Sequence, residues 1–429
     1  MNEDLVVLAD GQVMGQVSRK GQRLTFEYDP AWLAFPGAFP LSTSMPMVVA
    51  EHGHAVVEAF LWGLLPDNDA VLTRWGQRFG VSPRNPFKLI AHVGEDVAGA
   101  LQFVRPDRVA ALADVPDGPV VTWLDDGALD ERIRLLLADA SAGRRAGDHG
   151  QFSLAGAQPK TALYRDPDSG RWGIPEGRTP TTHILKPATG AFDGFAVNEH
   201  FCLCLAASLG LPAVESQVIR CDQSMVIVTE RYDRVTINGW PHRRHQEDFC
   251  QALAVPPQKK YQNQGGPSAK AIGAVLWDLS VKPMDDVWCF AESLALNWLI
   301  GGTDGHAKNY SLLLGPSGDV RLAPLYDIAS SLPYPDHIVP EKATLAIRVG
   351  RDYRVRDIKR SNWESCAREL RLGPGDMIER IHGLIDRLPG HAAQCAGALS
   401  EEGLDDPIVH RLVDAISGHA NRCRDALAG

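Results

Sequence analysis

The stretch that decides the fold is residues 303–327, TDGHAKNYSLLLGPSGDVRLAPLYD. It contains two apolar arms, 310–314 and 320–324, which are joined by a short segment rich in glycine and proline. Two apolar runs separated by such turn residues are typical of a β-hairpin. Because the arms of a hairpin run antiparallel, residues just before the first arm and just after the second are expected to meet at its open end.

Three polar side chains flank this predicted open end. Asn309 immediately precedes the first arm, Asp327 follows the second, and Asp304 lies a few residues upstream. Their oxygens suit Mg²⁺, which usually shares its coordination with substrate phosphates. The interval from Asp304 to Asn309 is also that of the D-x-x-x-x-N catalytic loop of protein kinases, in which the Asp receives the substrate hydroxyl proton and the Asn binds metal. Asp327 then corresponds to the second metal-binding aspartate.

A single Asp or Asn in a glycine-rich loop is more often a turn former than a catalytic group. The shared hairpin and the kinase-like interval together favour phosphate transfer for Asp304, Asn309 and Asp327 as a set. His306 lies close to two of these residues, but one histidine without partner ligands is poor evidence for zinc. A structural hydrogen bond is the simpler interpretation of that side chain.

A nucleotide also needs positive charge and a backbone cradle around its phosphates. The glycine-containing segment GQFSLAGAQPKTAL, residues 150–163, precedes a predicted strand that ends in Lys186. Lys160, inside the segment, is a second candidate for phosphate contact. Glu199 on the following predicted helix could hold Lys186 through an ion pair, although a glutamate in the first turn of a helix often serves only the helix dipole.

Composition limits the class of protein. A length of 429 residues predicts two or three domains or lobes, and 45% apolar with 22% charged residues is typical of a globular chain. The net charge of -10 argues against direct nucleic-acid binding, and the eight cysteines form no C-x-x-C pair, which indicates reduced thiols. The acidic start MNEDLVVLAD lacks the features of a signal peptide, and the apolar runs are too short to span a membrane, so we expect a cytoplasmic protein.

The remaining chain mixes short strands and helices. Residues 5–28 are predicted as strands joined at Asp10-Gly11, with Leu24, Phe26 and Tyr28 on one face. Helices are predicted at 127–140, 196–209 and 286–300, and further strands at 182–186 and 225–229. A connection rich in proline and aspartate follows residue 104. The predicted division is a β-rich N-terminal subdomain at 1–110, a nucleotide-binding region at 111–235 and a mostly helical region with the catalytic and metal-binding residues at 236–429.

Ten motifs then link the chain to a known family. SLAGAQPKTAL, HILKP, NEHFCLCLA, ERYDR, HQEDFCQAL, GGTDGHAKNYSLLL and LAPLYDIA occur in this order, after FPLSTSMP, LLPDN and NPFKLIAHVGEDVAGAL. The combination closely resembles HipA, the kinase toxin family of bacterial toxin-antitoxin systems, over nearly the whole chain. The resemblance implies an α+β, protein-kinase-like bilobal fold with a small β-rich N-terminal subdomain and a mostly helical C-terminal lobe.

The resemblance also implies roles for individual residues. Asp304 would be the catalytic base, Asn309 and Asp327 would bind Mg²⁺, and Lys186 would contact the phosphates of ATP. The implied phosphate loop, adenine hinge and phosphate-side wall of the ATP site are 155–160, 230–232 and 306–309. The full set of implied ATP-binding residues is Ala155, Gly156, Ala157, Gln158, Pro159, Lys160, Lys186, Glu230, Arg231, Tyr232, His306, Ala307, Lys308, Asn309, Tyr326 and Asp327.

Regulation is implied at the phosphate loop. Ser153 matches the serine that such kinases autophosphorylate, a modification expected to expel the loop and switch the enzyme off. A serine beside glycines can also be a simple backbone cap, and only the resemblance favours the regulatory interpretation. Pro159 stands where the family leads us to expect an acidic residue, and it stiffens the loop.

The implied function is that of an ATP-dependent serine/threonine protein kinase and growth-arresting persistence toxin. Its substrate would be an aminoacyl-tRNA synthetase, such as glutamyl-tRNA synthetase. A dimeric HipB-like helix-turn-helix antitoxin would read the operator DNA and make the toxin a corepressor, in keeping with the acidic charge of this chain. Two alternatives stay open: a small-molecule kinase of the aminoglycoside or choline kinase type, and a corepressor partner without physiological kinase activity.

Overall fold

The computed structural model describes residues 2–113, 118–143, 153–189 and 192–428, which fold as an α+β protein. Packing divides the chain into two compact units. Unit 1 consists of Met1–Pro187, Thr229–Gln258 and Leu312–Asp319. Unit 2 consists of Ala188–Val228, Lys259–Ser311 and Val320–Gly429. Residues 150–152, at the start of the predicted phosphate-binding segment, lie outside the described residues.

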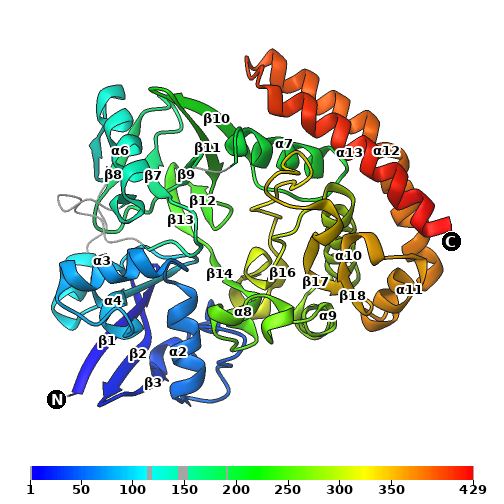
Figure 1. The fold of residues 1–429 in the computed structure, drawn as a ribbon. Helices are drawn as coiled ribbons and strands as arrows, with labels where there is room; N and C mark the ends of the chain where they lie inside the picture. The colour runs from blue at the N-terminus through cyan, green and yellow to red at the C-terminus, as the bar shows by residue number, and fades with distance from the viewer. Residues whose placement is uncertain (1, 114–117, 144–152, 190–191, 429) are drawn as a thin grey trace. The chain divides into compact units, whose positions relative to one another are not determined.

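Unit 1 begins with an antiparallel sheet in the order β4-β3-β2-β1-β5 (blue to cyan in Figure 1). Its strands are β1 (Asn2–Ala9), β2 (Gln12–Lys20), β3 (Arg23–Tyr28), β4 (Glu51–His52) and β5 (Leu101–Val104). Asp10 and Gly11 join β1 to β2 with φ of 47° and 79°, the left-handed backbone that tight hairpins favour. Leu24, Phe26 and Tyr28 are all buried, which confirms the β-rich start and the predicted face of β3.

Four helices cover this sheet: α1 (Pro30–Leu33), α2 (His54–Gly63), α3 (Asp69–Phe79) and α4 (Pro86–Val93). Local chemistry sets their ends. At α3 the side chain of Asn68 accepts hydrogen bonds from the first backbone N–H groups, and Gly80 closes the helix at φ 66°. Sheet and helices bury one continuous apolar core that includes Phe60, Ile90 and Phe103.

The rest of unit 1 carries the predicted nucleotide-binding residues. The strands of the second sheet that belong to unit 1 are antiparallel and have the order β9-β7-β8-β6. Its strands are β6 (Val121–Trp123), β7 (Thr161–Arg165), β8 (Trp172–Pro175) and β9 (His183–Pro187). The other elements are α5 (Val109–Ala113), α6 (Asp126–Ala138), β12 (Arg234–Ile237), β13 (Trp240–Arg243), β14 (His245–Asp248) and α8 (Phe249–Ala252). Both the predicted strand before Lys186 and the helix after Gly127 are thus present.

Unit 2 is mostly helical, as predicted for the C-terminal lobe. Its helices are α7 (Phe195–Ser208), α9 (Ala269–Leu279), α10 (Pro283–Ile300), α11 (Arg360–Glu369), α12 (Pro374–Glu401) and α13 (Pro407–Ala428). Its strands are β10 (Ser216–Cys221), β11 (Ser224–Glu230, which continues into unit 1), β16 (Val320–Leu322), β17 (Thr344–Val349) and β18 (Asp352–Arg354). The long helices α12 and α13 pack along each other (Figure 1).

Helix α10 is the centre of unit 2. Phe290, Leu294 and Trp298, on one stripe of the helix, are almost fully buried. In all, 12 of its 18 residues are buried, so the helix is enclosed on several sides. It ends at Gly301, whose φ of 63° only glycine adopts without strain, and this is the end predicted from the sequence. The catalytic candidates follow directly.

Among the described residues, no helix combines the length and the apolar character needed to cross a membrane.

The cysteines form no disulfide in the part of the chain that the structure describes, which includes all eight. Six of the eight thiols are buried. Burial raises the pKa of the Cys366 and Cys423 thiols to about 12, so that both are protonated and unreactive at neutral pH. Reduced, mostly buried thiols were predicted, and their role here is to fill the core.

A fully buried glutamate links two of the motifs within unit 1. Ser42 Oγ donates to Glu247 Oε2 at 2.5 Å, and the Thr43 N–H donates to Glu247 Oε1 at 2.8 Å. Glu247 has no exposed surface, and burial raises the pKa of its carboxyl to about 7. The folded protein therefore keeps the Glu247 proton to a higher pH than the unfolded chain does.

This raised pKa predicts a pH dependence of stability. The contribution of the Glu247 proton is complete below the ordinary glutamate pKa and is lost as the pH rises toward 7. Between pH 5 and pH 7.5 the unfolding free energy of wild type should therefore fall by about 2 kcal/mol relative to that of Glu247→Gln, which cannot ionise. Urea unfolding at several pH values measures this difference. The exposed Glu27→Gln is the control, and parallel curves for wild type and Glu247→Gln would contradict the assignment.

Candidate active site

The Asp304 loop is closed by its own backbone in unit 2. The carbonyl oxygen of Asp304 accepts from the His306 N–H at 2.7 Å and from Asn309 Nδ2 at 2.9 Å. The D-x-x-x-x-N interval therefore forms one tight loop, in which the Asn309 side chain holds the backbone of Asp304. The Asp304 side chain remains exposed, which leaves its carboxylate accessible to a substrate.

Tyr261 orients the Asp304 carboxylate. Its hydroxyl donates to Asp304 Oδ1 at 2.5 Å, and its ring packs edge-on against buried His306, with ring centroids 5.1 Å apart. Within the described chain, Asp304 Oδ2 accepts no hydrogen bond, so this oxygen can receive a proton. Sequence reasoning missed Tyr261, since it lies 43 positions upstream and no local pattern marks it. The structural hydrogen bond predicted for His306 stays a prediction, since this contact is one of packing.

The predicted hairpin is observed next to this loop. Its arms are β15 (Ser311–Leu314) and β16 (Val320–Leu322). The Ala323 N–H donates to Ser311 O at 2.8 Å. Tyr326 Oη donates to Lys308 O at 2.7 Å and lies 2.6 Å from Ser311 Oγ. The chain on either side of Asn309 and the chain just before Asp327 therefore lie together, as the hairpin argument required.

Asp327 has an unusual backbone conformation. Its φ of 53° lies in the left-handed region, which a non-glycine residue adopts at some cost in energy. Downstream, Asn198 on α7 holds the chain with both ends of its amide: Oδ1 accepts from the Ser330 N–H at 2.9 Å and Nδ2 donates to Ser330 O at 2.8 Å. Such fixed strain is characteristic of functional sites. Asn198 is a second positioning residue that the sequence analysis did not single out.

The donor set at the open end of the hairpin fits Mg²⁺. Because Asn309 Nδ2 is engaged by Asp304 O, the amide presents Oδ1, the atom type that magnesium prefers. Asp327 supplies a carboxylate that is only partly buried. Among the described residues, no group of three or more His, Cys, Asp or Glu side chains could hold a metal by itself. Mg²⁺ at Asn309 and Asp327 would thus depend on phosphate and water for its other ligands.

The predicted phosphate segment packs inside unit 1. Lys160 Nζ donates to Ala155 O at 2.7 Å, and Gly156 has a φ of 105° that a side chain would strain. A hydrogen bond also joins the segment to the N-terminal subdomain (residues 1–110), because Gly156 O accepts from the Asp67 N–H at 3.1 Å. Lys186 on β9 is 5% exposed. A lysine buried to this extent is not an ordinary solvated surface residue.

Ser153 is held in the same segment. It is fully buried, its Oγ donates to Leu64 O at 2.8 Å, and its N–H donates to Asp96 O at 3.0 Å. In this conformation the hydroxyl cannot reach a nucleotide from solvent. Phosphorylation of Ser153 would require the segment to leave the N-terminal module.

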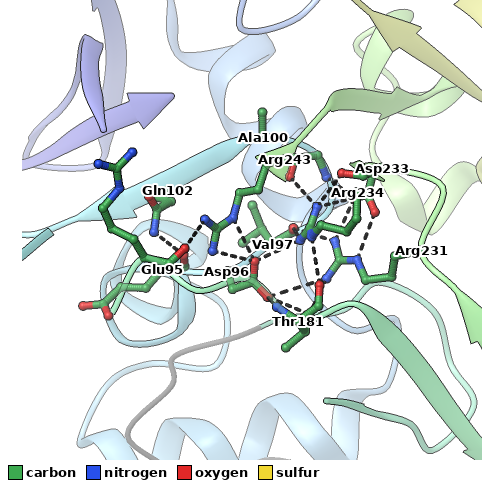
Figure 2. A network of polar contacts seen from close by, with 12 residues as sticks. Glu95, Asp96, Val97, Ala100, Gln102, Thr181, Arg231, Asp233, Arg234 and Arg243 are labelled. Carbon is green, nitrogen blue, oxygen red and sulfur yellow. Dashed lines mark hydrogen bonds and ion pairs between the residues drawn. The ribbon is translucent and has the colours of Figure 1, made fainter. Parts of the chain in front are cut away.

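Residues 230–232 lead into a buried ion network in unit 1 (Figure 2). Arg231 donates to Asp233 at 2.7 and 2.9 Å and to Thr181 Oγ1 at 2.8 Å. Tyr232 Oη donates to Gln246 Oε1 at 2.6 Å. The Arg231 and Tyr232 side chains thus have structural partners, so a contribution of this hinge to nucleotide binding would come from its backbone.

Asp96 is the second carboxylate of the network. It faces Arg234 at 2.9 Å, Arg243 at 3.0 Å and Arg231 at 3.7 Å (Figure 2). Burial opposes ionisation, but the three guanidinium groups outweigh it and hold the pKa of Asp96 well below its usual range. The network ties the end of α4, the chain before β9 and the chain after β11 into one structure.

Glu199 lies on α7 in unit 2 and is 2% exposed. Its predicted partner Lys186 belongs to unit 1, so the ion pair stays a prediction. A glutamate this strongly buried is more than a solvated partner of a helix dipole.

Comparison with known proteins decides the family. The model described as the HipA-like C-terminal domain matches residues 152–392, more than half of the chain, and the HipA N-terminal domain model matches residues 5–104. The chain belongs to the HipA family. This confirms the resemblance seen in the sequence motifs, and it makes the protein a kinase of the HipA type.

Individual HipA relatives agree with this assignment. Y4mE of Sinorhizobium fredii is 36% identical over 381 residues, which cover 88% of each chain. The serine/threonine-protein kinase toxin HipA of Shewanella oneidensis is 29% identical over 342 residues, covering 76% of this chain and 74% of that one.

A solved HipA structure confirms the fold. The structure of the S. oneidensis MR-1 toxin-antitoxin complex of HipA, HipB and operator DNA matches with a TM-score of 0.81 and 23% identity, over 98% of this chain and 97% of that chain. The HipA fold that the sequence predicted is therefore present along almost the full length.

Proposed function

We propose that this HipA-family kinase uses Mg-ATP to phosphorylate serine or threonine hydroxyls of proteins. The observation that carries the proposal is the closed Asp304–Asn309 loop beside the hairpin that delivers Asp327. Asp304 would receive the substrate hydroxyl proton through Oδ2 while Tyr261 holds Oδ1. Asn309 and Asp327 would hold Mg²⁺, which offsets the negative charge on the transferred phosphate.

The nucleotide contacts are proposed from the remaining predicted residues. Lys186 would contact the phosphates, with residues 155–160 as the backbone cradle and Lys160 as a further cation. The backbone of 230–232 would receive adenine, and residues 306–309 with Tyr326 would line the phosphate side. The burial of Lys186 supports its role, because a buried ammonium group gains most from an anionic partner.

Ser153 is proposed as a site of self-inactivation. Its hydroxyl donates to Leu64 O, and a phosphate there would carry about two negative charges and only acceptor oxygens. A phosphorylated Ser153 could not keep this bond, so the modification would release the segment that holds Gly156 and Lys160. Release of the phosphate cradle would lower ATP affinity and switch the kinase off.

The cellular role is proposed as that of a toxin that arrests growth. The solved S. oneidensis relative is a complex of HipA with HipB and operator DNA. We propose a HipB-like dimeric antitoxin as partner here, with DNA contacted through that antitoxin, since the charge of -10 disfavours direct binding by this chain. The proposed protein substrate is an aminoacyl-tRNA synthetase, with glutamyl-tRNA synthetase as the first to test.

Labelling with radioactive ATP tests the proposal. Wild-type protein with Mg²⁺ should label itself at Ser153, as identified by mass spectrometry, and the label should require the metal. Ser153→Ala should lose self-labelling but still label a protein in cell extract. Ser169→Ala, in an exposed turn of the same unit, is the matched control and should behave as wild type. Labelling of small metabolites alone would favour a small-molecule kinase, and no labelling at all would favour a corepressor without catalysis.

A further inference from the structure

A cavity of about 290 Å³ lies within unit 2 and is lined by none of the proposed catalytic, metal-binding or ATP-binding residues. Its walls come from the C-terminal end of α10, the segment 331–343, the short helix η8 (Val355–Asp357) and the last turns of α13. Small-molecule sites start at roughly 300 Å³, so the cavity is large enough for a small metabolite.

The interior of the cavity is apolar. Trp298, Leu332, Ile338, Pro340, Val355 and Ala426 line it. The indole of Trp298 is held in place, because its Nε1–H donates to Val355 O at 3.1 Å. A rigid aromatic wall of this kind favours an apolar ligand body without the entropic cost of ordering the site.

The rim of the cavity is cationic. Arg422 donates to His419 Nδ1 at 3.3 Å, and in the described part of the chain it forms no ion pair. Arg356 lies 3.6 Å from Asp357 in a pair whose side chains are 53% and 45% exposed, which is too exposed to neutralise it fully. Glu341 is the one acidic side chain among the lining residues. The lining residues themselves therefore carry two guanidinium groups and one carboxylate, while Asp357 lies outside the lining and pairs only weakly with Arg356.

His419 adds no charge of its own. Its Nε2–H donates to Trp298 O at 3.0 Å while Nδ1 accepts from Arg422. Burial lowers the pKa of His419 to about 4, so the imidazole is neutral at physiological pH. It serves to aim Arg422 along the edge of the cavity.

We infer that this cavity binds a small organic carboxylate with an apolar body. The carboxylate contacts Arg422 and Arg356 at the rim, since guanidinium groups pair well with carboxylates. The apolar body packs on Trp298 and Val355. This inference does not depend on the proposed protein substrate or on Ser153.

Hydrogen bonds join the chain just before Asp304 to the chain just after Asp327 at the wall of the cavity. Gly301 O, three residues before Asp304, accepts from Ser331 Oγ at 2.7 Å and from the Ser331 N–H at 3.1 Å. Ser330 lies just downstream of Asp327, and its Oγ donates to Ile300 O at 2.6 Å. A bound ligand therefore stabilises the contact between residues 300–301 and residues 330–331. It also slows amide hydrogen exchange in these two segments.

Binding of 4-phenylbutyrate and its neutral amide by calorimetry tests the inference. The acid should bind wild type with a Kd of about 1 mM and at least about tenfold more tightly than the amide, because only the acid pairs with the arginines. Arg422→Gln should remove this preference, and Ala426→Leu should weaken both probes by filling the cavity. Arg424→Gln is the matched control, an exposed arginine on the same helix that does not line the cavity.

Hydrogen exchange gives a second readout. The acid should protect amides in 300–306 and 330–332 of wild type and of Arg424→Gln. Equal binding of acid and amide, or binding unchanged by both Arg422→Gln and Ala426→Leu, would overturn the inference. So would the absence of binding of the acid to wild type up to about 10 mM.

Discussion

Replacing Asp304 with Asn should lower the rate of phosphate transfer by about 10²- to 10⁴-fold, the usual contribution of a positioned general base. An asparagine keeps the size of the side chain and can still accept from Tyr261 Oη. It cannot take up the substrate proton. The loop itself should remain folded, because the bonds that close it go to the backbone carbonyl of Asp304.

Single-turnover transfer from labelled ATP, together with a separate measurement of nucleotide binding, tests this expectation. Binding of Mg-ATP should change little, because the proposed metal ligands Asn309 and Asp327 are intact. Asp336→Asn is the matched control, since Asp336 is an exposed carboxylate in a turn of the same unit. Wild-type rates for Asp304→Asn would remove Asp304 from the catalytic role, whatever the fate of the control.

Local patterns explain how much of this site could be predicted. The hairpin depends on neighbouring residues: two apolar arms with Gly, Pro and Ser between them, observed at 311–314 and 320–322. The end of α10 at Gly301 is equally local, because the left-handed conformation there favours glycine. Where the chemistry of a few adjacent residues determines the conformation, the prediction agrees with the structure.

Contacts between distant segments could not be predicted in the same way. Tyr261 meets Asp304 across 43 positions, and Asn198 meets Ser330 across 132. No periodicity within one segment encodes such a contact, because it depends on how the helices of unit 2 pack. The buried ion network left one usable signal: Arg231 and Asp233 are two residues apart, a spacing that places side chains on the same side of an extended chain.

That network predicts a large loss of stability for Asp96→Asn, about 3–5 kcal/mol, the usual result of breaking a buried ion pair from one side. The side chains of Asp96, Asp233, Arg231, Arg234 and Arg243 are only 2–9% exposed. An asparagine would also be mismatched in either orientation. Asp96 Oδ1 accepts from Arg234 and Arg243, and Oδ2 accepts from the N–H and hydroxyl of Thr181, so the new NH₂ group would face other donors.

Urea unfolding of wild type and Asp96→Asn measures the loss. Asp107→Asn is the control, since Asp107 forms an exposed pair with Arg105 that is worth at most about 1 kcal/mol. The pH dependence gives an independent check. The pKa of Asp96 is lowered in the folded state, so its contribution is present above the ordinary aspartate pKa and is lost as the pH falls below it. The stability gap between wild type and variant should therefore narrow in acid.

A double variant separates charge from packing. The network holds three guanidinium groups and two carboxylates, a net charge of +1 that Asp96→Asn raises to +2. Adding Arg243→Met returns the charge to +1 with a side chain of similar length. If uncompensated buried charge is the main cost, the double variant should be more stable than Asp96→Asn, although it lacks one more polar contact. If the double variant is instead less stable than Asp96→Asn, the stability lost in Asp96→Asn comes mainly from the hydrogen bonds of Thr181.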